Sequence, residues 1–245
     1  TNDSPDLPFR HSVNPYRGCT HACAYCYARP THEYLGLGAG TDFDTRLVAK
    51  LRAPELLRGK LAGKGWRFET IAFSGDTDCY QPIEAHYRLT RGCLEACRDA
   101  SQPVMIITKS FLISRDADVL AELARRTRAS VAFSVAFDDD DLARAVEPGA
   151  PRPSKRFEAM RILADAGVRC GVMVAPIIPG LNEDAIPAVL ERAREHGARF
   201  ADSILLRLPH SVRHVFLERM RAALPDRVRR IESRLRDARA GALTE

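Results

Sequence analysis

The chain alternates short, nearly continuous apolar runs with longer segments whose apolar residues recur every three or four positions. Strands without a polar face are buried on both sides, so this pattern is typical of a parallel sheet that helices cover on its faces. The apolar runs predict strands over 68–75, 103–110, 130–137, 169–177 and 202–208. The amphipathic segments predict helices over 54–63, 83–100, 116–127, 154–167 and 184–197, with further helices from 209 to the end.

Five strand–helix repeats follow a short extended segment at 12–16, which makes six units. The sequence therefore predicts an α/β fold, a parallel six-unit β/α structure closed only partly into a barrel. A length of 245 residues without a low-complexity linker suits one domain, 1–245. In such folds the chemistry gathers on the loops that follow the carboxyl ends of the strands.

Composition and charge narrow the expected location of the protein and its possible partners. With 45% hydrophobic and 28% charged residues, no apolar run of transmembrane length and no signal peptide, we expect a cytoplasmic protein without a membrane partner. The net charge of +5 lies wholly in the C-terminal segment 207–245, where ten arginines face five acidic residues. This basic helical segment fits either a patch that contacts the phosphates of DNA or an ordinary arginine-rich solvated surface.

The stretch "RGCTHACAYCYARP" at 17–30 carries Cys19, Cys23 and Cys26 in the spacing Cys-x3-Cys-x2-Cys. An odd total of seven cysteines and a reducing cytosol disfavour disulfides. Structural zinc requires four ligands, and His21 or His32 could supply the fourth. An iron–sulfur cluster on three thiolates would keep one iron open, whereas structural and electron-transfer clusters normally have four cysteine ligands. The spacing favours an iron–sulfur cluster that binds a further ligand at its open iron, and a zinc site remains an alternative.

Three segments together resemble the radical S-adenosylmethionine (SAM) superfamily. The first is the cysteine motif with Tyr25 before its last cysteine. The second, "SGDTD" at 74–78, is similar to the strand-2 motif that meets the methionine amino group. The third, "PIIPGLNE" at 176–183, resembles the strand-5 segment, with Pro176 in place of the first glycine. The resemblance implies an open barrel of the radical SAM type, in which Cys19, Cys23 and Cys26 hold a [4Fe–4S] cluster that binds SAM.

Two further stretches, "HEYLGLGAGTDFDTRLVAK" at 32–50 and "TDCYQPIEAHYRLTR" at 77–91, resemble the spore photoproduct lyase-like branch, which contains DNA-repair enzymes. In this resemblance Lys109 would meet the methionine carboxylate, Ser134 the ribose, and the backbone beside Tyr25 the adenine. The complete set of implied SAM-binding residues is Tyr25, Ser74, Gly75, Asp76, Thr77, Asp78, Lys109, Ser134 and Ile178.

The hydrogen donor is the point at which the sequence departs from the lyase. That enzyme has a cysteine inside its strand-2 motif, where this chain has Gly75. Cys79, four residues further on, is the candidate replacement, with a buried packing role as its alternative. Tyr80 is a candidate radical relay under the same alternative. Glu147, in a loop rich in proline and glycine, is a further candidate for contact with substrate or SAM.

The implied activity is reductive cleavage of SAM to methionine and a 5′-deoxyadenosyl radical, which abstracts hydrogen from a substrate. The resemblance implies a reductant protein of the flavodoxin or ferredoxin type as partner, and a lyase-like reaction on DNA or a nucleobase lesion. Three alternatives remain: a radical SAM enzyme acting on a peptide or small molecule, a non-catalytic iron–sulfur redox or binding protein, and a zinc-stabilised nucleic-acid-binding module.

Overall fold

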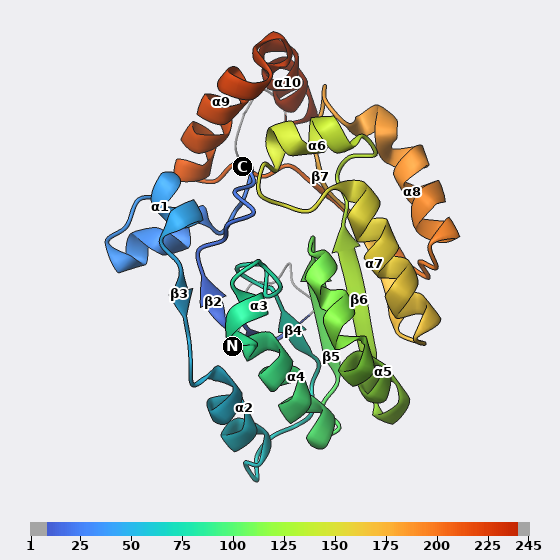
Figure 1. Cartoon of the computed structure of the whole chain (residues 1–245). Coiled ribbons are helices and arrows are strands. Elements are labelled where there is room, and N and C mark those ends of the chain that lie inside the picture. The colour runs from blue at the N-terminus through green and yellow to red at the C-terminus, as the bar shows by residue number, and fades with distance from the viewer. Residues whose placement is uncertain (1–8, 240–245) are drawn as a thin grey trace.

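The computed structural model describes residues 9–239, and its main sheet has six strands that are all parallel (Figure 1). The order is β1-β4-β5-β6-β7-β8, so the sheet grows outward in one direction along the chain. This arrangement confirms the predicted six-unit parallel β/α structure. The strands are β1 His11–Val13, β4 Ile71–Phe73, β5 Val104–Thr108, β6 Ala129–Ser134, β7 Arg169–Ile177 and β8 Ala201–Leu205.

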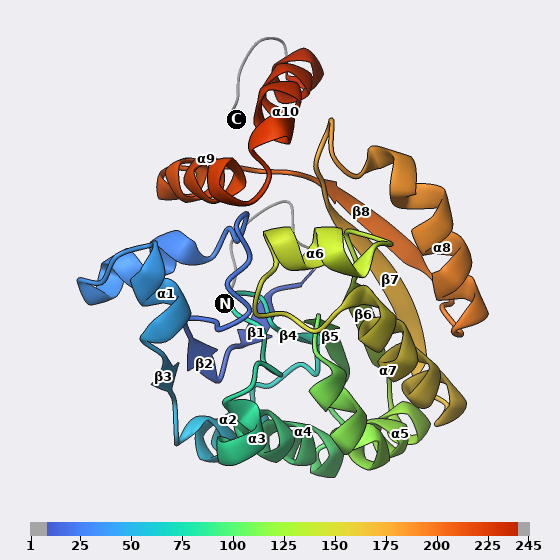
Figure 2. The same ribbon diagram turned by 45° about the horizontal axis from the view of Figure 1, so that its top comes forward.

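A row of helices covers the outer side of the curved sheet, which stays open between β1 and β8 (Figure 2). The sheet is therefore a partial barrel, as predicted. Consecutive helices of this row contact each other, and their bounds lie close to the predicted ones. The row consists of α2 Ala53–Leu61, α4 Leu89–Asp99, α5 Ala117–Arg126, α7 Pro153–Asp165 and α8 Ile186–Glu195.

Short elements lie between and above these units. β2 (Tyr16–Arg17) precedes the cysteine loop and β3 (Val48–Ala49) follows the segment after it. The two strands form a small antiparallel pair. Strands of two residues carry no periodicity, so the sequence pattern could not predict them. The remaining short elements are η1 Arg29–Leu35, α1 Thr41–Thr45, α3 Glu84–Tyr87, η2 Phe111–Asp116, α6 Asp140–Val146 and η3 Glu183–Ala185.

The helix predicted over 83–100 is in fact two helices, α3 and α4. Arg88 between them has a φ of 51°, in the left-handed region, which ends α3. The buried carboxylate of Glu84 accepts hydrogen bonds from the backbone N–H groups of Thr90 (2.9 Å) and Arg91 (3.2 Å). These are unpaired donors of the first turn of α4, so the carboxylate caps the second helix and favours the break.

The last strand also differs from its prediction. All five residues of β8 are exposed, because this strand is the free edge of the sheet. The apolar residues that suggested a buried strand lie partly beyond its end, where Leu206 and Leu208 are buried. They belong to a hydrophobic cluster at the carboxyl end of the sheet rather than to the layer between sheet and helices.

Two large hydrophobic clusters result, beside a small one around Cys19. The first, which we call the sheet core, lies between the sheet and the outer helices. The second, which we call the loop core, joins Cys23 and Tyr25 of the cysteine loop to α9 (Ser211–Ala223) and α10 (Pro225–Ala238). The two C-terminal helices therefore sit on the cysteine loop. Within residues 9–239, no helix is both long and apolar enough to cross a membrane.

Candidate active site

The three cysteines of the loop at 17–30 lie together at the carboxyl end of the sheet. Cys19 and Cys23 are each 7% exposed and Cys26 is half-buried. Cys26 packs against both the loop core and the small apolar group that contains Cys19. All seven cysteines are free thiols, so the structure contains none of the disulfides that we considered.

Burial is the main influence on these thiols. It raises the pKa of Cys23 to about 12, although the cation of Lys109 acts in the opposite direction. Burial also raises the pKa values of Cys19 and Cys26, and the neighbouring thiolates add to the increase at Cys19. Three thiols that repel each other once ionised are a suitable donor set for a positively charged iron–sulfur core, which binds them as thiolates.

The backbone of the loop is fixed at its start by a buried amide. The Nε2 of Gln81 donates to the carbonyl of Gly18 at 2.8 Å, and its Oε1 accepts from the N–H of Thr20 at 3.2 Å. The N–H of Cys19 donates to the carbonyl of Phe43 at 2.9 Å. Gly18 has a φ of 73°, and a Cβ there would lie 2.9 Å from that same carbonyl. The first cysteine is thus held by contacts that no local motif in the sequence indicated.

The end of the loop is fixed by Arg29, which is fully buried. Its Nη2 donates to the carbonyl of Cys23 at 2.8 Å and to Oδ1 of Asp44 at 2.9 Å, and its Nη1 donates to the carbonyl of Ala39 at 2.9 Å. The guanidinium also stands 5.1 Å from the ring centroid of Phe43. A buried cation with these partners organises several loop carbonyls at once, because arginine carries five fixed donors.

The loop that precedes α7 packs directly on the cysteine loop. The N–H of Gly149 donates to the carbonyl of His21 at 3.0 Å, and the N–H of Ala24 donates to the carbonyl of Val146 at 2.9 Å. A Cβ on Gly149 would stand 1.9 Å from the carbonyl oxygen of Thr20. Only glycine allows the two backbones to come this close.

A buried group of charges adjoins Tyr25. The hydroxyl of Tyr25 donates to Glu147, which also forms an ion pair with Arg156. Arg156 in turn donates to the carbonyl of Ser134 at 2.9 Å. Burial alone would raise the pKa of Glu147, but Arg156 and Lys109 outweigh it, so the pKa of Glu147 is lowered. The carboxylate is therefore charged at neutral pH.

Lys109, at the end of β5, adds a second cation to this group. Its Nζ lies 5.5 Å from the ring centroid of Tyr25. Burial lowers the pKa of Lys109, but the neighbouring Cys23 and Glu147 raise it by more. The pKa of Lys109 therefore lies above its usual value. Arg156 pairs with Glu147, and Lys109 adds a second cation near the cysteines, an arrangement suited to an anionic group such as a carboxylate.

The predicted strand-2 segment, 74–78, runs beside the cysteine loop. The hydroxyl of Tyr27 donates to the carbonyl of Gly75 at 2.9 Å, and Thr77 donates to the carbonyl of Tyr16 at 3.0 Å. Ser74 has a φ of 67°, and its Oγ accepts from the N–H of Cys79 at 3.0 Å. These contacts fix the segment against the loop, but they also occupy the side chains of Ser74 and Thr77.

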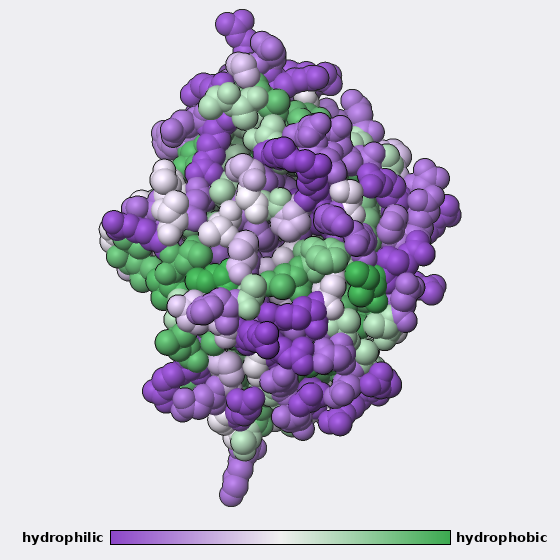
Figure 3. Space-filling view, viewed as in Figure 1, coloured by the Kyte–Doolittle hydropathy of each residue, from purple (hydrophilic) through white to green (hydrophobic). Residues whose placement is uncertain are grey.

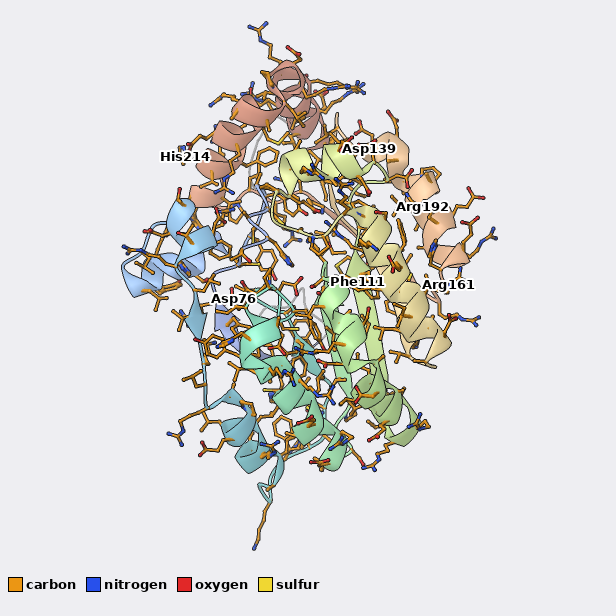
Figure 4. The ribbon with its side chains drawn as sticks, in the orientation of Figure 1. Asp76, Phe111, Asp139, Arg161, Arg192 and His214 are labelled. Carbon is orange, nitrogen blue, oxygen red and sulfur yellow. The ribbon has the colours of Figure 1, made fainter. Side chains whose placement is uncertain are left out.

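The two aspartates of this segment differ. Both carboxylate oxygens of Asp78 accept from Thr108, Oδ2 also accepts from the N–H of Lys109 at 2.8 Å, and Oδ1 from the N–H of Tyr80 at 2.9 Å. Asp78 therefore connects β4 to β5. Asp76 is half-buried and lies at the mouth of the barrel (Figure 4), and burial raises the pKa of its carboxyl despite the nearby cations of Arg17 and Lys50.

The ends of β6 and β7 bring in Ser134 and Ile178. The Oγ of Ser134 donates to the carbonyl of Ala175 at 3.1 Å. Ile178 is fully buried in the loop core with Cys23 and Tyr25, and its N–H donates to Oδ1 of Asn182 at 2.6 Å. The predicted residues Tyr25, Lys109, Ser134 and Ile178 therefore gather around the cysteine loop from three strands and the loop itself.

Cys79 and Tyr80, the candidate hydrogen donor and relay, lie elsewhere. Both are fully buried in the sheet core, and burial raises the pKa of the Cys79 thiol well above its usual value. The hydroxyl of Tyr80 donates to the buried carboxylate of Asp116 at 3.1 Å. These surroundings match the packing alternative that we gave for each residue.

His21, considered above as a zinc ligand, lies in the cysteine loop, and the motif did not indicate its surroundings. It is 2% exposed, and burial lowers its pKa. Its Nδ1 lies 3.5 Å from Oδ2 of Asp78, whereas Nε2 has no hydrogen-bond partner among the described residues. A buried, orphaned polar atom beside three thiols is a place where a bound group would complete the hydrogen bonding.

The donor set fits an iron–sulfur cluster. Each cysteine of a four-iron cube binds a different iron, so the thiols share a loop without converging on one point. Over residues 9–239, no three His, Cys, Asp or Glu side chains are arranged around a single ion. Of the histidines considered as a fourth zinc ligand, His32 already bonds the carbonyl of Arg46 through Nε2 at 2.8 Å.

The sequence and the fold of this chain are similar to those of known proteins. The family model described as "Radical SAM superfamily" matches residues 13–193. An uncharacterised protein of Mycobacterium tuberculosis, Rv2578c, is 42% identical over 226 residues, which cover 91% of this chain and 66% of that protein. An uncharacterised protein of Methanocaldococcus jannaschii, MJ0683, is 31% identical over 173 residues, which cover 70% of this chain and 62% of that protein.

Solved structures of spore photoproduct lyase share the fold. A cysteine-to-serine mutant of that enzyme aligns with a TM-score of 0.66 at 18% identity, over 89% of this chain and 62% of the lyase. A double mutant with bound AdoMet and dinucleoside spore photoproduct aligns with a TM-score of 0.62 at 18% identity, over 91% of this chain and 64% of the lyase. The chain thus spans just under two thirds of the length of these relatives.

Proposed function

This chain belongs to the radical SAM superfamily, and we propose that it cleaves SAM reductively at a [4Fe–4S] cluster held by Cys19, Cys23 and Cys26. A cluster bound there would supply the electron that converts SAM to methionine and a 5′-deoxyadenosyl radical, and that radical would abstract hydrogen from the substrate. The observation that carries the proposal is the gathering of three free thiols with Lys109 and Tyr25 at the carboxyl ends of the strands.

The side chains around the loop suggest how SAM would be held. Lys109, a cation beside the ring of Tyr25, would receive the methionine carboxylate. Asp76 is the better acceptor for the ammonium group, because the carboxylate of Asp78 already has three protein donors. His21, whose Nε2 lacks a protein partner, and Ser134 at the end of β6 would contribute polar contacts. The apolar packing of Ile178 and the loop core would exclude water.

For the substrate we propose DNA or a nucleobase lesion, with a lyase-like reaction. The likeness of fold to spore photoproduct lyase supports this choice, as do two exposed aromatic rings near the loop, Tyr27 and Tyr34, on which bases could stack. An apolar band crosses the middle of the face seen in Figure 3, at the level of Phe111 in the same view in Figure 4. We further propose a flavodoxin- or ferredoxin-type protein as electron donor and the cytoplasm as location, where thiols stay reduced.

The test of the reaction is anaerobic. We would reconstitute the protein with iron and sulfide, reduce it with dithionite, add SAM and measure 5′-deoxyadenosine by chromatography. We expect product from the wild type and from Cys93→Ala, whose cysteine lies in the sheet core, but none from Cys23→Ala. Equal product from Cys23→Ala, or zinc in place of iron after anaerobic reconstitution, would overturn the proposal.

The test of the substrate uses the same preparation. Ultraviolet-irradiated DNA would be incubated with the reduced protein and SAM, and lesions counted by mass spectrometry after digestion. We expect lesion loss that requires SAM and Cys23. Formation of 5′-deoxyadenosine without any change in the DNA would instead favour a peptide or small-molecule substrate.

A further inference from the structure

The C-terminal helices lie outside residues 13–193, which the family model matches, yet they contact the cysteine loop. Phe216 and Met220 of α9 are buried in the loop core with Cys23 and Tyr25. Figure 2 shows α9 lying across the open side of the barrel, and α9 contacts η1, which begins at Arg29 near the end of the cysteine loop. The described part of the basic C-terminal segment, residues 207–239, is therefore packed on the cysteine loop and is more than a solvated appendage.

One charged contact links α9 to the loop backbone. The Nη1 of Arg219 donates to the carbonyl of Ala22 at 2.7 Å. Ala22 stands between Cys19 and Cys23, and its φ of 53° lies in the left-handed region, which alanine rarely adopts. The hydrogen bond from Arg219 thus stabilises a strained turn between the first two cysteines.

Arg219 is also part of a chain of charges. It forms an ion pair with Oδ2 of Asp44, whose Oδ1 lies 2.9 Å from the Nη2 of Arg29. Arg29 donates to the carbonyl of Cys23, so the loop is held by one arginine on each side of the shared carboxylate. Arg29 is fully buried, and the side chains of Asp44 and Arg219 are 11% and 27% exposed. Two cations and one anion leave one net positive charge against the loop.

We propose that Arg219 is a positioning residue for the iron–sulfur site, supplied by the C-terminal helix, and that the Arg219–Asp44–Arg29 chain sets the reduction potential of that site. This inference rests on the proposed function. Reduction adds negative charge to the cluster, and a fixed, partly buried cation stabilises the reduced form. The cation therefore raises the potential, and the hydrogen bond to Ala22 keeps the loop in its binding conformation.

The charge chain allows a test with two substitutions of opposite effect. Arg219→Gln removes a cation, so the reduction potential measured by electron paramagnetic resonance titration should become more negative than that of the wild type. Asp44→Asn removes the anion between two arginines, so the potential should become less negative. Damage to the fold alone would lower cluster occupancy in both variants without moving their potentials in opposite directions.

Two further variants complete the design. Arg219→Lys keeps the charge and should restore a potential close to the wild-type value. Arg221→Gln is the matched control on the same helix: its side chain is 62% exposed and 3.8 Å from Glu232, so the potential should not move. Potentials that shift in the same direction in Arg219→Gln and Asp44→Asn, or that do not shift, would overturn the electrostatic part of the proposal.

The positioning part is measured without iron. In the apoprotein, amide hydrogen exchange at residues 19–26 should be faster in Arg219→Gln than in the wild type and in Arg221→Gln. Equal exchange in all three proteins would overturn it. If the wild type accepts no [4Fe–4S] cluster, the proposed function fails, but the exchange measurement still decides whether Arg219 holds the loop.

Discussion

At the scale of single residues, the cysteine loop depends on a close approach that one side chain controls. Gly149 lies so near Thr20 that an added Cβ would be 1.9 Å from a backbone carbonyl, a contact that neither flexible side chains nor small shifts can absorb. Gly59, in α2, has no atom within 4 Å of an added Cβ and provides the matched position.

We therefore expect Gly149→Ala to move the two backbones apart, to lower the free energy of unfolding by about 1–3 kcal/mol and to reduce iron bound after reconstitution. Gly59→Ala should instead raise the free energy of unfolding by about 0.5–1 kcal/mol, because alanine is the better helix former. Urea unfolding and iron analysis check both variants. Full iron binding in Gly149→Ala would contradict the proposed fit of the two loops.

The residues of the site differ in how far the sequence could predict them. Cys19, Cys23 and Cys26 were proposed from their spacing, whereas Lys109 and Ser134 lie at strand ends and received their roles through the resemblance to the lyase. The buried partners Gln81, Arg29 and Arg156 could not be found this way, because each acts through hydrogen bonds to backbone carbonyls or side chains of other segments. No periodicity or motif encodes such a contact, and only the folded backbone brings the partners together.

At the scale of elements, the same limit appears in α3 and α4. Their combined stretch has the periodicity of one helix, and the break at Arg88 depends on the carboxylate of Glu84 reaching the first turn of α4. By contrast, the strands and the outer helices were predicted well, because burial on both faces of a parallel sheet leaves a strong pattern. The free edge strand β8 was misread, since the apolar residues beyond it serve the loop core.

The break at Arg88 yields a stability prediction. Arg88 is exposed and adopts the left-handed conformation, which costs a residue with a Cβ about 1–2 kcal/mol and glycine almost nothing. After allowance for the entropy of glycine in the unfolded chain, Arg88→Gly should be more stable than the wild type by about 1 kcal/mol. Arg88→Ala keeps the Cβ and should unfold like the wild type. Thermal unfolding of both variants would separate this backbone effect from the loss of the charge; equal melting temperatures for the glycine and alanine variants would refute it.

At the scale of the whole molecule, the superfamily and the partial barrel predicted from the sequence are confirmed, and the C-terminal segment shows two faces. The inner face packs on the cysteine loop through Phe216, Met220 and Arg219. The outer face carries the arginines of α10, and His214 lies on the exposed side of α9 (Figure 4). A ligand that binds the outer face would thus lie one helix away from the cysteine loop, at a distance that suits the DNA substrate proposed above.

This arrangement predicts how binding to DNA responds to salt. The exposed arginines of α10 are Arg227, Arg229, Arg230, Arg234 and Arg236. If they contact phosphates, the logarithm of the association constant falls with the logarithm of the salt concentration by about 0.9 for each phosphate neutralised. Replacing Arg229, Arg234 and Arg236 by glutamine should therefore reduce this slope by about 2–3, as measured by fluorescence anisotropy with a labelled duplex between 50 and 200 mM salt.

Three exposed arginines elsewhere, Arg67, Arg125 and Arg194, provide a control with the same change in net charge. Their replacement by glutamine should lower long-range attraction slightly and leave the slope nearly unchanged, because counterions are released only where phosphates are contacted. Equal slopes for the two triple variants would mean that the basic C-terminal surface does not bind DNA. The excess of arginine would then serve only the contact between α9 and the cysteine loop, and the substrate would have to be sought among peptides and small molecules.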